Sequence, residues 1–176
     1  MQGNNYNDRG SNTGFRPQGG GSRSRGNEAS KEDRLSIDDF MEENPFCKDW
    51  ILSGADEKMV SFAEKAGKYM APQNGNENDK QKLSKSQIRN VFGEIKRIQL
   101  KGYNTSEGKS SFMLLKPKVA YAEGRNKTKG LSLFKRIFDE GWNVVANNNA
   151  TNVQYGNFCA LLEAILAYHK AFGGKD

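Results

Sequence analysis

The sequence predicts an all-α fold, a compact bundle of about five to six helices that follows a disordered N-terminal tail. Three observations support this prediction. Apolar residues after residue 34 recur three, four and seven positions apart, which is the spacing of one helix face. No segment alternates apolar and polar residues as a half-buried strand does. The apolar content of the whole chain is only 35%, which indicates that part of it never joins a core.

The tail comprises residues 1–34, which are mainly Gly, Asn, Ser and Arg, with Tyr6 and Phe15 as the only aromatic residues. This small apolar surface cannot offset the entropy that the chain would lose on ordering, and we therefore expect the tail to be disordered. Residues 35–176 are expected to form a single helical domain. The Arg and Gly residues fit two interpretations. One is a weak, sequence-tolerant RNA-binding tail, and the other is a solubilising linker.

The first helical segments of the domain are short. Residues 36–40 are a candidate helix start, and an apolar group follows at residues 50–52. Apolar residues then recur at helical spacing over residues 56–70, and this helix ends before Pro72. The polar residues 71–81 predict a loop.

The clearest helix begins at a serine cap, either Ser84 or Ser86, and ends at Gly102. Its apolar residues form a single stripe along one face. Another apolar segment covers residues 112–122. There Pro117 either kinks a helix or lies in the first turn of a helix that starts nearby.

Two further helices complete the prediction. Residues 131–145 carry an apolar stripe, with an irregularity expected at residues 141–142, a Gly-Trp pair. The last helix is capped by Thr151 or Asn152, and residues 158–172 provide its buried stripe. No apolar run reaches the length of a membrane span and no signal region opens the chain, so a soluble cytoplasmic protein is expected.

The charge of the chain is concentrated in its central third. Residues 80–136 hold 15 basic and 3 acidic side chains, a net charge of +12, whereas the net charge of the whole chain is +6. Such a block repels itself unless an anionic partner neutralises it. Nucleic acid is the partner that this pattern favours.

Catalytic and metal sites are not predicted. The chain has one histidine, His169, on the apolar side of the last helix, where we expect a core residue because no Cys, Asp or second His lies at ligand spacing. Cys47 and Cys159 lie far apart and are expected to be reduced. The paired acids are adjacent and diverge on a helix, and no Gly-Lys-Ser/Thr loop follows a strand. The sequence therefore predicts a non-enzyme without cofactor or metal.

Two groups of cations are candidates for RNA binding. The first surrounds the apolar stripe of the helix after Ser84, where cations at every turn or two fit a phosphate backbone. An ordinary solvated face gives a similar pattern, but acids are almost absent nearby in the sequence. This group consists of Lys85, Arg89, Lys96 and Arg97.

The second group lies around Tyr121, which follows Lys118 by three residues and precedes Arg125 by four, so that in a helix it lies beside both. Tyr121 either stacks on a base or packs in the core with its hydroxyl at the surface. Lys116 and Lys127 extend the group, although Lys127 follows a helix end and fits a loose loop charge equally well. No motif with sequence readout appears, so recognition of backbone and shape is expected.

Three stretches resemble a known family. Residues 83–92 are similar to the pattern Leu-Ser/Thr-x-Ser-Gln-Ile-Arg, and residues 114–125 to Leu-Arg/Lys-Pro-Lys-Leu-Ala-Tyr-x-x-Gly-Arg. Residues 167–176 are similar to a C-terminus with Tyr-x-x-x-Phe/Tyr-Gly-Gly. In this order, in a basic helical chain, they resemble the small subunit of the type III-A CRISPR effector (Csm) complex. The resemblance covers residues 83–176, and more loosely begins at residue 56.

This resemblance implies an all-helical subunit of a ribonucleoprotein in antiviral defence. Several copies stack along the CRISPR RNA and its target RNA, beside a repeated backbone subunit that cleaves RNA. The small subunit holds the duplex through its sugar-phosphate backbone. By position, the resemblance implies structural roles for Gln87, Ile88 and Phe92, and RNA contacts for Lys85, Arg89, Lys96, Arg97, Lys116, Lys118 and Arg125.

Other functions remain open at the level of sequence. A free-standing, sequence-neutral binder of single-stranded RNA or DNA needs only the Arg/Gly tail and basic helices. It would bind nucleic acid tightly alone, whereas an assembly subunit gains affinity from its neighbours. A protein whose cations meet acidic protein partners is a third class, and a nuclease that uses His169 ranks last.

Overall fold

The computed structural model describes residues 35–76 and 78–174, which form eight α-helices and one 3-10 helix with no strand among them. The predicted all-α class is confirmed. The predictions for the tail fall on residues 1–34, which lie outside the described residues. The elements are α1 (Ile37–Glu43), α2 (Asp49–Leu52), α3 (Glu57–Met70), the 3-10 helix η1 (Gln73–Gly75), α4 (Lys85–Lys101), α5 (Ser106–Met113), α6 (Leu115–Arg125), α7 (Lys129–Asn147) and α8 (Asn152–Ala171).

Side chains at the helix ends explain where the longest helices begin. Ser84 caps α4, and the amide of Gln87 accepts a hydrogen bond from the Ser84 backbone N–H at 2.8 Å. Thr151 and Gln154 form the same reciprocal capping box at the start of α8, with a distance of 2.9 Å. Pro117 lies in the first turn of α6, where its missing N–H costs no helical hydrogen bond.

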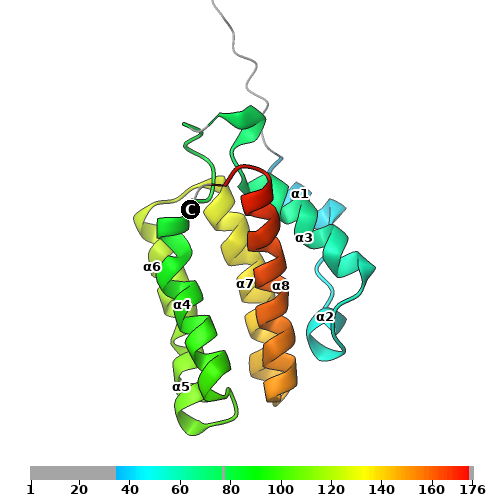
Figure 1. Ribbon diagram of the computed structural model, residues 1–176, viewed down its shortest axis with the longest axis vertical. Helices are drawn as coiled ribbons and strands as arrows, with labels where there is room; N and C mark the ends of the chain where they lie inside the picture. Colours follow the sequence, from blue (N-terminus) through cyan, green and yellow to red (C-terminus); the bar gives the residue numbers. More distant parts are fainter. Residues whose placement is uncertain (1–34, 77, 175–176) are drawn as a thin grey trace, which may run out of the picture. The chain divides into compact units, whose positions relative to one another are not determined.

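The helices are arranged in groups around α7 and α8. Figure 1 shows α7 and α8 side by side, with α4, α5 and α6 along one side of them and α1, α2 and α3 along the other. The contact between α3 and α8 is the most extensive in this part of the chain. At Gly67 the two helices approach so closely that an added Cβ would lie 2.6 Å from the backbone nitrogen of His169.

The predicted irregularity at residues 141–142 is wrong, because α7 is a single α-helix from Lys129 to Asn147. Gly141 is needed there for packing. A Cβ at this position would lie 2.8 Å from the ring of Phe158, so the glycine lets α8 approach α7. The neighbouring Trp142 donates its indole N–H to the backbone oxygen of Phe112 at 3.1 Å, which connects α7 to α5.

The core is continuous through the described helices and rich in aromatic rings. Tyr155 of α8 stacks on Tyr103 with ring centroids 5.0 Å apart, and its hydroxyl donates to the backbone oxygen of Ile95 at 2.9 Å. Burial raises the pKa of the nearby Cys159 thiol to about 12, and both cysteines are free thiols. Within the described residues, no helix has the length and apolar character needed to cross a membrane.

Candidate nucleic-acid interface

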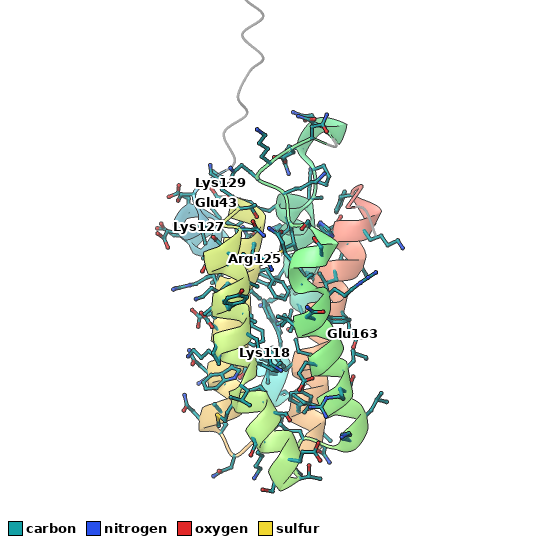
Figure 2. All side chains as sticks on the ribbon, turned by 90° about the vertical axis from the view of Figure 1, so that its left-hand side faces the viewer. Glu43, Lys118, Arg125, Lys127, Lys129 and Glu163 are labelled. Atoms are coloured by element: carbon teal, nitrogen blue, oxygen red, sulfur yellow. The ribbon has the colours of Figure 1, made fainter. Side chains whose placement is uncertain are left out.

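A groove with a volume of about 640 Å³ lies between α4 and α6, which contact each other directly. Figure 2 shows this side of the bundle, with Lys118 and Arg125 on α6 beside α4. Its polar and aromatic lining comes from the start of α4, from α6 and from the turn after α6. These lining residues are Ser86, Gln87, Asn90, Lys118, Tyr121, Arg125 and Asn126.

The sequence of α6 explains why three predicted residues share this groove. Leu115 and Val119 are four residues apart and fully buried, which fixes the inner face of the helix. Lys118, Tyr121 and Arg125, spaced by three and four, therefore share an outer face. Tyr121 is 70% exposed. Of the two roles that the sequence left open for Tyr121, packing in the core is excluded.

Gln87 holds the two walls of the groove together at one end. Its side-chain oxygen accepts from the N–H of Ser84, and its amide nitrogen donates to the backbone oxygen of Asn126 at 3.0 Å. The same side chain thus caps α4 and binds the end of α6. Both ends of the Gln87 amide are used within the protein.

Glu94 connects α4 to α6 at the next turns. Its carboxylate accepts from the guanidinium of Arg97 at 2.6 and 3.0 Å, and lies 3.7 Å from the Lys118 ammonium. The hydrogen bonds from Arg97, and then the charge of Lys118, hold the pKa of Glu94 below its usual value. Glu94 thus partly neutralises both cations, and the three groups together carry a net charge of +1 beside the groove.

Two of the cations predicted on α4 are engaged within the protein. Lys96 lies 2.7 Å from the carboxylate of Glu163, which α8 contributes. Arg97 pairs with Glu94 and, at 3.4 Å, with Glu107, and these carboxylates raise the pKa of Arg97. The sequence indicated few acids near these cations. That expectation is wrong for the folded protein, because Glu163 lies next to Lys96 although it follows Lys96 by 67 residues in the sequence.

Arg89 lies on a different surface from the residues of α6. It lines a second groove of about 530 Å³ between α4 and α8, together with Phe92 and Leu166. Within the described part of the chain, no ion pair engages Arg89. Lys85 is the first residue of α4, and its side chain lies outside the described ones.

Lys116 and Lys127 border a third groove, between α6 and α7. The ammonium of Lys116 lies 4.4 Å from the centroid of the Trp142 ring and donates to the side chain of Asn143 at 3.2 Å. Asp139, among other acids, shares this groove. The cations predicted from the sequence therefore divide among three surfaces, and only the α4–α6 groove combines them with an exposed aromatic ring.

The sequence reasoning missed two residues of this groove, Asn90 and Asn126. Both are exposed, and in the described part of the chain no hydrogen-bond partner engages either side-chain amide. The spacing of Gln87 and Asn90 by three residues predicts that they share a helix face. That this face is opposite α6 depends on tertiary packing, which no local pattern indicates.

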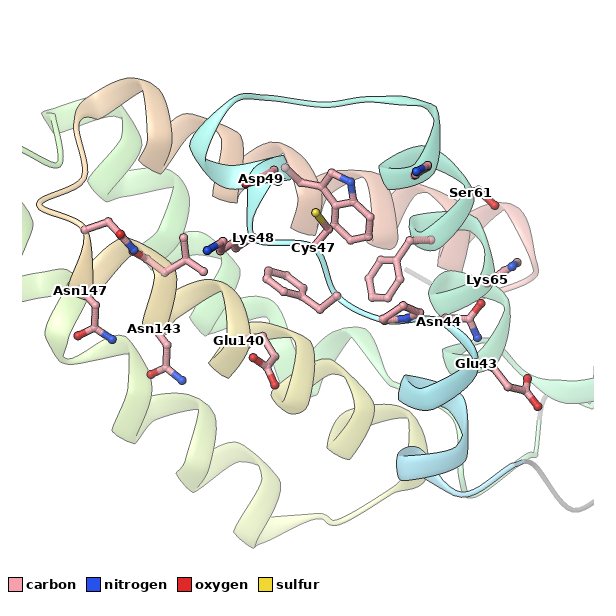
Figure 3. A pocket seen from close by; sticks show the side chains of 17 residues that line it. Glu43, Asn44, Cys47, Lys48, Asp49, Ser61, Lys65, Glu140, Asn143 and Asn147 are labelled. Carbon is pink, nitrogen blue, oxygen red and sulfur yellow. The ribbon is translucent and has the colours of Figure 1, made fainter.

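A larger hollow, of about 930 Å³, lies between residues 43–50, α3 and α7. Figure 3 shows Glu43, Lys65 and Glu140 around it. Its lining includes as many lysines as acids, so it has no preference for an anion. We therefore assign the candidate interface to the smaller α4–α6 groove.

His169 is a core residue, as the sequence predicts. It is 6% exposed, and its Nε2 lies 3.1 Å from the backbone oxygen of Leu83. Burial, the main cause, lowers its pKa. Among the described residues, no group of His, Cys, Asp and Glu side chains could hold a metal ion.

The chain matches a known protein family. The family model described as Csm2 Type III-A matches residues 57–175, about two thirds of the chain. The match begins at the first residue of α3, so α1 and α2 lie outside it. No curated protein and no solved structure matches the chain.

Proposed function

We propose that this chain, which belongs to the Csm2 Type III-A family, binds RNA without cleaving it. As a member of that family it is a small subunit of the type III-A CRISPR complex. It is a member of the effector complex with the other Csm subunits. In this proposal several copies stack along the duplex of CRISPR RNA and target RNA in the cytoplasm, and the repeated backbone subunit cleaves the target.

The observation that carries the proposal is the shared outer face of α6. Lys118 and Arg125 lie on either side of an exposed Tyr121, next to a groove with free amides. Cations spaced along a helix contact successive phosphates, and an exposed aromatic ring between them is typical of sequence-neutral RNA contacts. In this proposal Lys96 and Arg97 of α4 contribute less to phosphate binding, because carboxylates pair with both of them at 2.6–2.7 Å.

A non-catalytic role is consistent with the position of the only histidine. His169 is buried and its ring bonds to Leu83, so it has no access to an RNA at the α4–α6 groove. General acid–base catalysis needs a titratable group within hydrogen-bond reach of the reacting atoms. The residues that line the groove include no histidine and no carboxylate, the side chains that most often take this role.

The salt dependence of RNA affinity tests the proposal. Neutralising two phosphate contacts with Lys118→Gln and Arg125→Gln should lower the affinity of the full chain for an RNA duplex. It should also reduce the slope of log affinity against log salt by about 1.5 units. The measurement is fluorescence anisotropy with labelled RNA at several salt concentrations.

The matched control is Lys58→Gln with Lys65→Gln, which removes two exposed lysines from α3, away from the groove. An equal loss in both double variants would show a general effect of net charge and contradict the assignment of the site. Co-purification from cells that express the other Csm subunits then separates the two modes of action. Miscellaneous RNA without Csm subunits would indicate a free-standing binder.

A further inference from the structure

We propose that the α4–α6 groove holds one unpaired base of the bound RNA, stacked on Tyr121, with the adjoining phosphates on Lys118 and Arg125. The inference rests on the proposed function and goes further, because it assigns a nucleotide pocket where the function requires only backbone contacts. Four features of the groove carry it: a free aromatic ring, apolar walls, free amides and flanking cations.

The ring of Tyr121 is available for stacking. With 70% of the residue exposed, it has no ring contact with any described side chain. The other tyrosines of the described helices are more buried, and Tyr103 and Tyr155 stack on each other in the core. Every nucleobase has a flat face that can stack on such a ring.

The walls next to Tyr121 are apolar. Val91 is contributed by α4, and Pro117 and Ala122 by α6. A pocket for a small ring system combines such walls with a few polar groups that fix its orientation. The second face or the edge of a base on Tyr121 can therefore contact carbon atoms instead of water.

The polar groups come from two asparagines. Asn90 lies on the α4 side and Asn126 just after α6, and each has an exposed amide that no described residue engages. An amide offers two donors and one acceptor, which match the Watson–Crick edge of a base. Gln87 contributes no such group, because its amide connects Ser84 to Asn126 and keeps the pocket at a fixed width.

The cations fit the charges on either side of a nucleotide. Lys118 and Arg125 lie about one turn before and one turn after Tyr121 on the same face of α6. A base on the ring would place its own phosphate near one cation and the next phosphate near the other. This charge complementarity favours a nucleotide over an uncharged ring system.

The base must be unpaired. In an A-form duplex each base is stacked on both faces, and its Watson–Crick edge is covered by its partner. The pocket lies between two helices that Gln87 and Glu94 hold together, so a base can enter only after it leaves the stack. The structure thus assigns to this groove a preference for RNA with a displaced base over a perfect duplex.

Two RNA probes test the inference on the purified full chain. One is a fully paired RNA duplex, and the other is the same duplex with a single bulged 2-aminopurine. We expect wild type to bind the bulged RNA about tenfold more tightly and to quench 2-aminopurine fluorescence on stacking. Tyr121→Leu should lose the tenfold preference for the bulged RNA and the quenching, whereas Tyr121→Phe should keep both.

The outcomes separate this inference from the proposed function. If wild type binds both probes equally, with the salt dependence of phosphate contacts, the base pocket is wrong and the RNA-binding function stands. If Tyr121→Leu weakens both probes by the same factor, the ring contacts the duplex generally and the pocket is also wrong. Absence of binding to either RNA even at low salt, where phosphate contacts are strongest, overturns both proposals and leaves an acidic protein partner for the cations.

Discussion

The side chain of His169 connects the end of α8 to the segment between α3 and α4. Its Nε2 lies 3.1 Å from the oxygen of Leu83, and the N–H of Leu83 donates to the oxygen of Met70 at 2.8 Å. The ring is closed off by Gly174, where an added Cβ would overlap the ring atoms. The end of α8 thereby holds the segment that leads from α3 into α4.

This position predicts a pH dependence of stability. Burial and the charge of Lys82 lower the pKa of His169, while the hydrogen bond to Leu83 opposes them in part. In the unfolded chain the pKa returns to about 6.5. As the pH falls below that value, the unfolded state binds more protons than the folded state, so the free energy of unfolding decreases.

The measurement is the urea midpoint of unfolding between about pH 7.5 and pH 5, above the range of the carboxylates. His169→Gln is the control, since its amide nitrogen can donate to Leu83 and does not titrate. Wild type should lose stability more steeply than the variant as the pH falls. Parallel curves would show that His169 does not carry the dependence.

At the scale of single residues, the sequence predicted the place of a side chain on its own helix better than the partners that the fold brings to it. Tyr121 could be placed among cations from its spacing alone, and His169 in the core from its apolar neighbours. Lys96 could not be recognised as paired, because Glu163 lies far along the chain and approaches only when α8 packs against α4. Ion pairs between helices depend on tertiary packing, which periodicity does not encode.

The glutamine that caps α4 has a second hydrogen bond outside its own helix, whereas the glutamine that caps α8 has none among the described residues. Both helices begin with a capping box, formed by Gln87 in α4 and Gln154 in α8. Only Gln87 also donates to a second helix, through the oxygen of Asn126. Substituting each glutamine in turn can therefore distinguish the effect of a capping box on stability from the effect of the Gln87–Asn126 bond on the groove.

We predict that Gln154→Ala lowers the free energy of unfolding by about 1 kcal/mol, and Gln87→Ala by about 1–2 kcal/mol because it also removes the hydrogen bond to Asn126. Only Gln87→Ala should weaken RNA binding, because it releases the end of α6 that carries Arg125. Thermal unfolding measures the first effect and fluorescence anisotropy the second. Equal RNA affinities in the two variants would show that the bond to Asn126 does not position the groove.

At the scale of elements, the local signals of the sequence were strong for α3, α4, α7 and α8. Their caps agree with the structure, and so do their apolar stripes except at Phe172, which was expected in the buried stripe of α8 but is exposed just after that helix. The choice between Ser84 and Ser86 is decided by the capping box with Gln87. The pairing of α4 with α6 could not be predicted, since it depends on which apolar stripes meet in the core. For the same reason the sequence could not show which groove each group of cations lines, with Arg89 between α4 and α8 and Lys118 between α4 and α6.

The charge of the whole molecule is partly neutralised by the fold. The basic block of residues 80–136 carries a net +12, and carboxylates from within it and from α8 engage Lys96, Arg97 and Lys101. No ion pair with a described residue engages Arg125 or Lys127. Arg125 and Lys127, at the end of α6 and in the turn after it, therefore keep their charge in the region that both proposals assign to RNA. Arg89 also keeps its charge, on α4, whereas Lys118 shares Glu94 with Arg97.

The family match and the packing of the core give different starting points for the domain. The match begins at residue 57, whereas α1 and α2 lie before it. Yet Phe40, Trp50 and Ile51 are buried in the core, and Trp50 lies 5.0 Å from the ring of Phe62 in α3. The backbone oxygen of Ile51 also accepts from Asn157 of α8 at 3.0 Å.

A comparison of two truncated chains tests which boundary is physical. A chain of residues 35–176 should keep the unfolding temperature of the full chain, since it retains the three buried side chains. A chain of residues 57–176 loses all three. Removing one large buried side chain costs about 2–5 kcal/mol, and a domain is stable by only about 5–15 kcal/mol, so this chain should be unfolded or aggregated. Circular dichroism and thermal unfolding measure both, and a stable, cooperatively folded chain of residues 57–176 would show that α1 and α2 are an appendage and not part of the domain.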